Sequence, residues 1–390
     1  MEFGIESETK DFMVERNGKR FIDLTKILPE RLPSGKLILW KQIDEEKIEI
    51  FVDKHSAPGG NPKPIRIKRF IEINELLFEG LGLRFGDGLK IQGGKKIVFG
   101  FSNTNLELHK HFLKFAKECL GIDSKEFRVA LTIPPVLSDK IKELEEKISR
   151  ELRIPLENFF TARILEKSKQ PIINTKINSA ILGRVIERMF QSLKDILLNR
   201  TFSAAFLKGV IASEANISLR NGKLDEISIG SKEKPNRELI RLLLLNLSIF
   251  PNKDKEIEGQ EAVLLHGLSN FRKMREWNLV SLHPEKFEAF ERGLKGFKKE
   301  EFRKGEAKLL ILQSLTKSSK NITQLAKELG RAWRSIVDHL WVLEDLGLVG
   351  RRRVSRRVIW FITEKGKEML KDENALEKLR IGLPRKKSNH

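Results

Sequence analysis

Two apolar stretches of helical length each carry a carboxylate at their end. The first covers residues 76–88 and contains Asp87, and the second covers residues 206–215 and contains Glu214. In each stretch a glycine stands five residues before the acid, and a very small residue directly precedes it. These small residues are Gly82 and Gly86 in the first stretch, and Gly209 and Ser213 in the second. The pattern predicts two similar apolar helices, because the apolar positions run through most of each stretch.

The segments after the two acids also match each other. Residues 89–99 and 217–229 are typical of hairpins, because Gly-Gly and Asn-Gly at their tips tolerate the positive φ of a type I′ turn. Each hairpin leads to an apolar helix, for which Asn105 and Asn236 are the expected N-caps. The two acids are 214 − 87 = 127 residues apart, a period that suits a duplicated half-domain rather than a solenoid unit.

These paired motifs resemble the LAGLIDADG homing-endonuclease family in its single-chain form with two repeats. The resemblance covers residues 71–297 and implies an α+β fold with two pseudo-symmetric αββαββα repeats, in which the small residues let the two motif helices pack side by side. Two positions depart from the family pattern: Ala215 stands where the family usually has glycine, and Ala212 occupies the first acidic position. The last acid of each motif, which the family's chemistry requires, is present in both copies.

The pattern divides the chain into five segments. Residues 1–70 contain short strand candidates between prolines and glycines and predict a small β-rich segment, to which we assign no chemistry. Residues 71–200 and 201–300 are the two expected repeats, and residues 278–282 are a strand candidate within the second. Residues 303–372 change to short helices and a hairpin, and residues 373–390 form a basic tail.

The short C-terminal helices resemble a winged helix-turn-helix. Short helices are predicted at residues 306–315, 322–330 and 332–345, and we expect the last of them to enter a DNA major groove. The hairpin at residues 348–363 is the expected wing, which would touch the DNA backbone or minor groove. The candidate DNA-binding residues of this segment are Arg331, Arg334, Ser335, Arg351, Arg352, Arg353, Arg356 and Arg357.

Composition narrows the classes of function. The net charge is 74 − 54 = +20 and the pI is about 9.8, which favours a polyanionic partner, although solvated basic faces in a lysine-rich proteome are an alternative explanation. The chain has no Tyr, which excludes recombinases and topoisomerases that use a tyrosine nucleophile. One cysteine, Cys119, excludes an internal disulfide. Neither a membrane span nor a signal peptide is recognisable, so we expect a cytoplasmic protein.

The resemblance implies a catalytic and metal-binding role for Asp87 and Glu214, side by side at the bottom of a DNA-binding saddle. Mg²⁺ or Mn²⁺ is the expected cofactor, because hard cations prefer carboxylate and phosphate oxygens. A purely structural role is the poorer explanation, because an acid at a helix C-terminus has the wrong sign for the helix dipole. The histidines are scattered and predicted to be structural: His109, His111, His266 and His283.

The hairpins are the expected recognition surface, because alternate side chains of a strand face the same way. Basic side chains would bind phosphates, and Gln or Arg could read bases. The candidates are Lys90, Gln92, Lys95 and Lys96 in the first repeat, and Ser218, Arg220 and Lys223 in the second.

The sequence therefore predicts a monomeric, site-specific, metal-dependent endonuclease that acts on double-stranded DNA. The alternative is a DNA-binding transcription regulator that kept the saddle and lost cleavage. The two retained acids favour the endonuclease, whereas the appended winged segment favours the regulator. An RNA partner also stays open, since a basic saddle could bind RNA.

Overall fold

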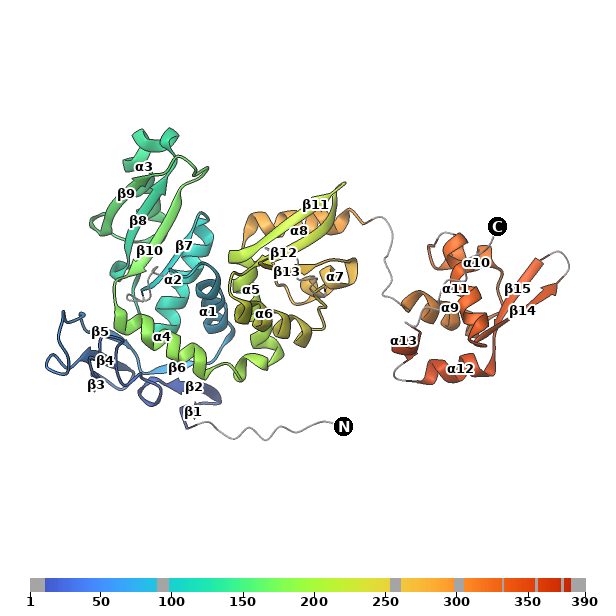
Figure 1. Ribbon diagram of the computed structural model, residues 1–390, viewed down its shortest axis with the longest axis horizontal. Helices are drawn as coiled ribbons and strands as arrows, with labels where there is room; N and C mark the ends of the chain where they lie inside the picture. The colour runs from blue at the N-terminus through green and yellow to red at the C-terminus, as the bar shows by residue number, and fades with distance from the viewer. Residues whose placement is uncertain are drawn as a thin grey trace. The chain divides into compact units, whose positions relative to one another are not determined.

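The computed structural model describes residues 11–89, 98–252, 261–297, 305–331, 333–354, 357–372 and 375–379. The chain forms two compact units (Figure 1). The larger unit contains residues 1–266 and 270–294, and the smaller contains residues 267–269 and 295–390. Over the described ranges, no helix is both long and apolar enough to cross a membrane.

Two buried helices, α1 (Glu75–Asp87) and α5 (Arg200–Glu214), lie side by side at the centre of the larger unit (Figure 1). Their backbones touch at two glycines. A Cβ added at Gly82 would lie 2.2 Å from the carbonyl oxygen of Phe206, and one added at Gly209 would lie 2.3 Å from that of Glu79. Only glycine fits at either position, so these residues set the distance between the helices.

A buried ion pair links the same two helices. The Lys208 Nζ of α5 lies 2.7 Å from the Glu79 Oε1 of α1, and both side chains are largely buried. Burial raises the pKa of Glu79, but hydrogen bonds and charges from His111 and Lys208 more than offset this, so that the pKa of this carboxyl is lowered. The pair therefore stays ionised and fixes the two helices in register along their length.

The first sheet has the strand order β7 (Phe99–Asn103), β10 (Ile172–Ile177), β8 (Arg128–Ile133) and β9 (Phe159–Ile164). One face packs on α2 (Leu106–Leu120), where Phe112 lies 5.2 and 5.3 Å from the rings of Phe99 and Phe101. The other face is more exposed, since Arg128, Ala130 and Thr132 alternate with the buried core residues of β8. Helix α4 (Ala180–Ser192) follows β10.

The edge strand β9 distinguishes this half from the αββαββα pattern expected from the resemblance. It pairs with β8 in parallel, whereas the other pairs in this sheet are antiparallel. A parallel pair needs a crossover, and here the crossover consists of a 3-10 helix (Pro135–Lys140) and α3 (Ile141–Leu152). An inserted helix and strand therefore widen the first sheet at its outer edge.

The second sheet contains β11 (Ala215–Arg220), β12 (Lys223–Gly230) and β13 (Ala262–Leu265), in that order. The predicted hairpin at residues 217–229 is confirmed by the pairing of β11 with β12. Helix α6 (Lys234–Asn246) packs on α5 and β13, and α7 (Leu268–Glu276) and α8 (Pro284–Lys295) follow.

Two local predictions in this half are wrong. Asn236 does not cap α6, because Pro235 allows the helix to begin earlier, with Glu233 as its N-cap. Residues 278–282 form a turn and not a strand: Asn278 has φ 53°, and the Leu279 N–H donates to the Met274 carbonyl at 3.0 Å. Leu279 and Val280 of this apolar run are buried in the turn that follows α7, which explains why the run looked like a core strand.

The N-terminal segment, described from residue 11, consists mainly of short strands and loops. Strands β1 (Met13–Arg16), β2 (Lys19–Asp23) and β6 (Phe70–Glu72) form one small antiparallel sheet. A second sheet consists of β3 (Ile38–Gln42), β4 (Lys47–Val52) and β5 (Ile65–Lys68). The Arg69–Asp23 ion pair, with 2.8 Å between Nη2 and Oδ2, ties the segment between the two sheets to β2.

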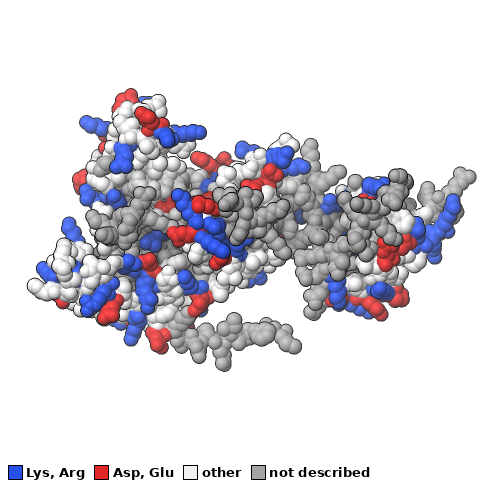
Figure 2. Space-filling view, in the orientation of Figure 1, with Lys and Arg blue, Asp and Glu red and all other residues white. Residues whose placement is uncertain are grey.

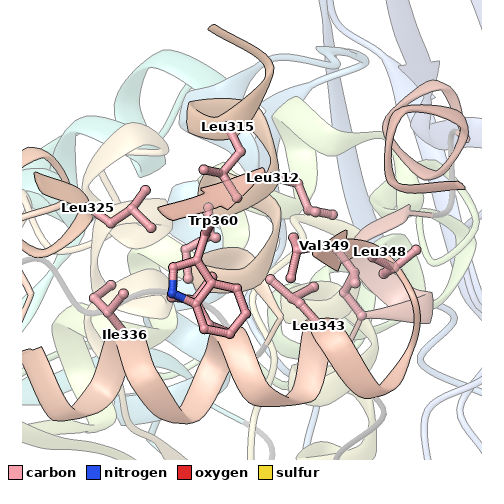
Figure 3. Packing of buried hydrophobic residues seen from close by; sticks show 11 residues of the cluster. Leu312, Leu315, Leu325, Ile336, Leu343, Leu348, Val349 and Trp360 are labelled. Atoms are coloured by element: carbon pink, nitrogen blue, oxygen red, sulfur yellow. The ribbon is translucent and has the colours of Figure 1, made fainter. Parts of the chain in front are cut away.

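The smaller unit contains α9 (Glu306–Lys317), α10 (Ile322–Glu328) and α11 (Trp333–Asp345), followed by the hairpin β14 (Val349–Val354) and β15 (Arg357–Ile362). Helices α12 (Glu364–Lys371) and α13 (Ala375–Lys378) complete it. Figure 3 shows Trp360 of the hairpin packed among leucines and isoleucine of the helices. The helices and hairpin lie where the sequence predicted them.

Candidate functional site

The acids Asp87 and Glu214 lie at the adjoining C-terminal ends of α1 and α5. A Cβ added at Gly86 would stand 2.8 Å from the Glu214 Cγ and 2.6 Å from the Ser213 Cβ. A larger residue at position 86 would push the helix ends apart. The structure therefore brings the two predicted site residues together, from positions far apart in the chain.

Asp87 is held by β7. The Asn103 side chain donates to Asp87 Oδ2 at 2.6 Å. Burial raises the pKa of Asp87, while the Asn103 hydrogen bond and the charge of Lys286 act in the opposite direction. A carboxyl that burial disfavours as an anion is one that a nearby cation would stabilise.

The third charged group of the site is Lys286, in the first turn of α8, which the sequence did not reveal. Its Nζ donates to three carbonyls at the end of α5, those of Ile211 (3.2 Å), Ala212 (2.6 Å) and Ser213 (3.1 Å). Burial lowers the pKa of Lys286 to about 8, and the charges of Asp87 and Glu214 limit that fall. The amine thus lies close enough to both acids to interact with them electrostatically.

No local signal marks Lys286 among the 74 lysines and arginines of the chain. Its acceptors belong to a helix 73 to 75 residues earlier. Only the assembled fold reveals that this amine faces the end of α5.

His109 supports the Asp87 side of the site from within the core. Its ring nitrogens lie 3.1 Å from the Thr175 hydroxyl and 3.1 Å from the carbonyl oxygen of Asn103, the residue whose side chain holds Asp87. Burial lowers the pKa of His109 to about 4. The predicted structural role of this histidine agrees with its full burial.

We expect the larger unit to become less stable as the pH is lowered, because of the titration of His109. Its folded-state pKa of about 4 lies below the unfolded value of 6.5, so the unfolded chain binds the proton first as the pH falls. Between pH 7 and pH 5 the loss is about 2 kcal/mol from this group. Urea unfolding of wild type and His109→Gln at pH 7 and pH 5 measures this loss of stability. An equal pH dependence in the two proteins would contradict the assignment.

A cavity of about 430 Å³ opens beside Glu214. Its walls come from the end of α1, from the segment after β12 and from Glu261, and Gly230 leaves room next to Glu214 Oε2. Among the described residues no group of three or more His, Cys, Asp or Glu side chains is arranged to hold a metal ion. A cation at this site would therefore complete its shell with water or with ligand oxygens, as Mg²⁺ commonly does.

The structure describes only some of the predicted recognition residues. Lys90, Gln92, Lys95 and Lys96 lie outside the described residues. Arg220 and Lys223 are opposite each other in the strand register at the tip of the β11–β12 hairpin, and Ser218 lies opposite Glu226. These positions form one end of the second sheet.

Two further basic residues lie on the exposed face of the first sheet, where the sequence interpretation did not place any. The Arg128 guanidinium and the Lys176 amine lie 4.5 and 4.8 Å from the Phe160 ring centroid. Lys176 is directly opposite Arg128 in the β10–β8 pairing. The alternation of polar and apolar residues in residues 128–133 could have identified Arg128.

In the smaller unit the predicted DNA-binding residues differ in their surroundings. Arg334 lies 3.7 Å from Asp338, whereas Arg351 pairs with Glu344 at 3.0 Å and stacks 4.4 Å from the Trp341 ring. Arg352 and Arg353 are exposed, and Arg331 and Ser335 are half-buried. Arg356 and the side chain of Arg357 lie outside the description. Arg351 therefore anchors the hairpin to α11.

Comparison with known families identifies part of the larger unit. A family model described as a LAGLIDADG-like domain matches residues 201–276, from the start of α5 to the end of α7. Over these residues the chain is similar to the LAGLIDADG-like domain family. The matched segment includes Glu214, and it is the part of the chain in which α5 contributes its half of the paired helices.

Several solved structures are similar at low identity. I-DmoI in complex with DNA and Mn is 18% identical, with 53% of this chain and 97% of that chain covered and a TM-score of 0.30. The N-terminal LAGLIDADG domain of DUF199/WhiA is 13% identical, with 54% and 85% covered and a TM-score of 0.32. Full-length DUF199/WhiA from Thermatoga maritima is 12% identical, with 70% and 90% covered and a TM-score of 0.35. No curated protein matches the chain.

Proposed function

We propose that the protein is a site-specific DNA endonuclease that hydrolyses phosphodiester bonds with a divalent metal. One observation carries the proposal: the paired helices α1 and α5 end in adjoining acids, Asp87 and Glu214, and Lys286 interacts with both. A carboxylate pair at a helix junction beside a half-buried lysine has no structural need of its own, because acids at helix C-termini oppose the helix dipole.

The donor set suits a hard cation. Asp87 and Glu214 would hold Mg²⁺ or Mn²⁺, because carboxylate oxygens are the ligands that these ions prefer. A bound cation would supply an activated water and neutralise the charge that develops on phosphate oxygens during hydrolysis. The raised pKa of Asp87 supports this role, since a cation would compensate the burial of its charge.

The chain's own residues have separate tasks. Asn103 orients the Asp87 carboxylate through its 2.6 Å hydrogen bond. Lys286 holds a positive charge next to the acids, where a DNA phosphate would approach. The glycine contacts at Gly82, Gly86 and Gly209, together with Ser213, keep the helix ends close enough for each acid to serve one DNA strand.

The proposed domain organisation places two LAGLIDADG repeats at residues 71–200 and 201–300, preceded by the β-rich segment 1–70. Both acids come from one chain, which supports a monomer acting on double-stranded DNA. We expect it to act in the cytoplasm. The hairpin tips and the exposed faces of both sheets would bind the duplex. Arg128 and Lys176 belong to this surface, because they stand on the exposed side of the first sheet.

The smaller unit would be a winged helix-turn-helix at residues 303–372, followed by the basic tail 373–390. In this assignment α10 and α11 are the helix-turn-helix and β14–β15 is the wing. Arg352 and Arg353 are exposed on β14 and suit contacts to phosphates. The same unit favours a second candidate function, a DNA-binding transcription regulator without cleavage, because an enzyme that reads its target through a saddle does not require a separate reader.

Incubation with a DNA library and Mg²⁺ or Mn²⁺ decides between the two. Cleavage at one sequence supports the endonuclease. Sequence-specific binding without any cutting, in either ion, would overturn the endonuclease and support the regulator. Chelation of the ion is the control, since cleavage by the proposed site stops when the metal is removed.

Replacing Lys286 by Met is expected to slow cleavage about 100-fold, as the loss of one positioned charge does in other enzymes. Wild-type cleavage should also fall above pH 8, because the pKa of Lys286 is about 8 and its charge is lost there. Single-turnover cleavage from pH 6.5 to pH 9.5 measures both effects. The exposed Lys234→Met is the matched control. An alkaline fall that persists in Lys286→Met would show that another group causes it.

A further inference from the structure

A cleft of about 800 Å³ lies between α2 and α3, on the helical side of the first sheet. This side is opposite the strand face that carries Arg128 and Lys176, because α2 packs on the buried residues of the sheet. The buried Leu113 and Leu152 are among the residues that line the cleft. Six basic residues also line it: Lys110, Lys114, Lys117, Lys147, Arg150 and Arg153.

Only some of this positive charge is neutralised within the protein. Lys110 lies 2.9 Å from Glu107 and 2.6 Å from Glu151, and Lys117 lies 4.0 Å from Asp123. In the parts of the chain that the structure describes, no ion pair engages the other four basic residues that line the cleft. The acids among its lining residues are Glu118 and Glu151, so the cleft carries a net positive charge. Figure 2 shows Lys and Arg side chains spread over the surface around α3.

Helix stability explains two of the six basic residues. Lys117 and Arg150 stand in the last turns of α2 and α3, where a cation complements the helix dipole. Lys110, Lys114 and Lys147 stand earlier in their helices, so the dipole gives no reason for them. Arg153 ends α3 with φ 55°, a left-handed conformation that favours glycine, yet the position holds a long cationic side chain.

The spacing of the cations suits a linear polyanion. Lys110, Lys114 and Lys117 follow one face of α2 at intervals of four and three residues, which covers about 10 Å at the helical rise. Lys147, Arg150 and Arg153 cover about 9 Å on α3 in the same way. Along a duplex axis the phosphates of each strand advance about 3.4 Å, and an extended single strand spaces them more widely, so each row of cations could contact about two of them.

We propose that the cleft between α2 and α3 binds the phosphate backbone of a single nucleic-acid strand. Lys114, Lys147 and Arg150 are the main contacts, and the apolar floor of Leu113 and Leu152 lies under the sugars. The Ser124 hydroxyl, which donates to the Arg153 carbonyl at 2.8 Å, fixes the end of the cleft. The protein therefore has a second nucleic-acid surface that is independent of the acids at the ends of α1 and α5.

The test uses fluorescein-labelled octathymidylate and the full chain, without divalent metal. A cleft variant, Lys114→Glu with Lys147→Glu and Arg150→Glu, is compared with a control of equal charge change, Lys125→Glu with Lys140→Glu and Lys142→Glu. The control residues are exposed and do not line the cleft. Fluorescence anisotropy at 50 to 200 mM NaCl gives the affinity and its salt dependence, and the thermal unfolding midpoint checks that both variants fold.

The cleft variant is expected to bind the oligonucleotide at least tenfold more weakly than wild type, and the control within threefold. A neutral variant, with Gln at the same three cleft positions, should lower the salt slope by about two, as expected for three lost contacts to a single strand. Equal loss in cleft and control variants would overturn the proposal, because it would show a general charge effect. Oligonucleotide binding is measured here without divalent metal, whereas cleavage requires the metal, so failure of the endonuclease proposal and failure of this one are distinguishable.

Discussion

Asp87→Asn and Glu214→Gln are each expected to lower DNA cleavage by about 1000-fold or more, because in the proposed site each removes a charge that the metal and the reaction would both need. The neutral side chains keep the size of the originals, so the paired helices should stay intact. DNA affinity in the absence of metal should stay within about threefold, since both changes remove negative charge near the phosphates. Cleavage kinetics and anisotropy with the same duplex measure the two quantities.

The matched control is Glu261→Gln, which removes a carboxylate from the wall of the cavity beside Glu214. We expect this variant to cleave at close to the wild-type rate. Asp87→Asn that cuts as fast as wild type would rule out the proposed site. Loss of binding together with loss of cleavage would instead point to damage of the fold.

Gly209→Ala is expected to destabilise the larger unit by about 3 kcal/mol or more, because overpacking against backbone cannot be relieved by a side-chain rotation. The added Cβ would lie 2.3 Å from the Glu79 carbonyl oxygen and 2.7 Å from the Leu83 backbone nitrogen. Gly82→Ala should behave alike, since its Cβ would lie 2.2 Å from the Phe206 carbonyl oxygen. Denaturant unfolding of the full chain, in which the unfolding transition of the larger unit is monitored, measures the change in the free energy of unfolding.

Gly60→Ala provides the comparison for the same chemical change. A Cβ at Gly60 would meet nothing within 4 Å, and its φ is not in the left-handed region. We expect its free energy of unfolding to change by less than about 0.5 kcal/mol, or to rise slightly through a less flexible unfolded chain. Similar losses in Gly60→Ala and Gly209→Ala would mean that the helices are not held by their glycine contacts.

The parts of the fold that the sequence predicted well depend on local patterns. Repeated motifs located Asp87 and Glu214, and Asn-Gly located the β11–β12 turn, where Asn221 and Gly222 both have positive φ. The helices of the smaller unit were visible because Asn321 and Gly330 mark the start and end of α10. In these cases the information lies within a few residues of the structure that it specifies.

The features that escaped prediction depend on contacts between distant residues. The parallel pairing of β9 was not visible, because strand direction is not encoded in the strand itself. Residues 278–282 were misread because a buried turn and a core strand have the same apolar composition. Lys286 was missed for a related reason: the α5 carbonyls and the two acids near its amine are far from it in the sequence.

The direct backbone contact between α1 and α5 limits how the protein can adapt to a ligand. With no side chain between Gly82, Gly209 and the opposing carbonyls, there is nothing at that junction that can rotate to let one half swing relative to the other. Large hinge motions need a few residues that absorb dihedral changes, and a tightly packed helix pair offers none. A duplex bound across both sheets would therefore have to bend to fit the protein. The protein would then favour target sites with flexible base steps at their centre, even though it does not contact those bases.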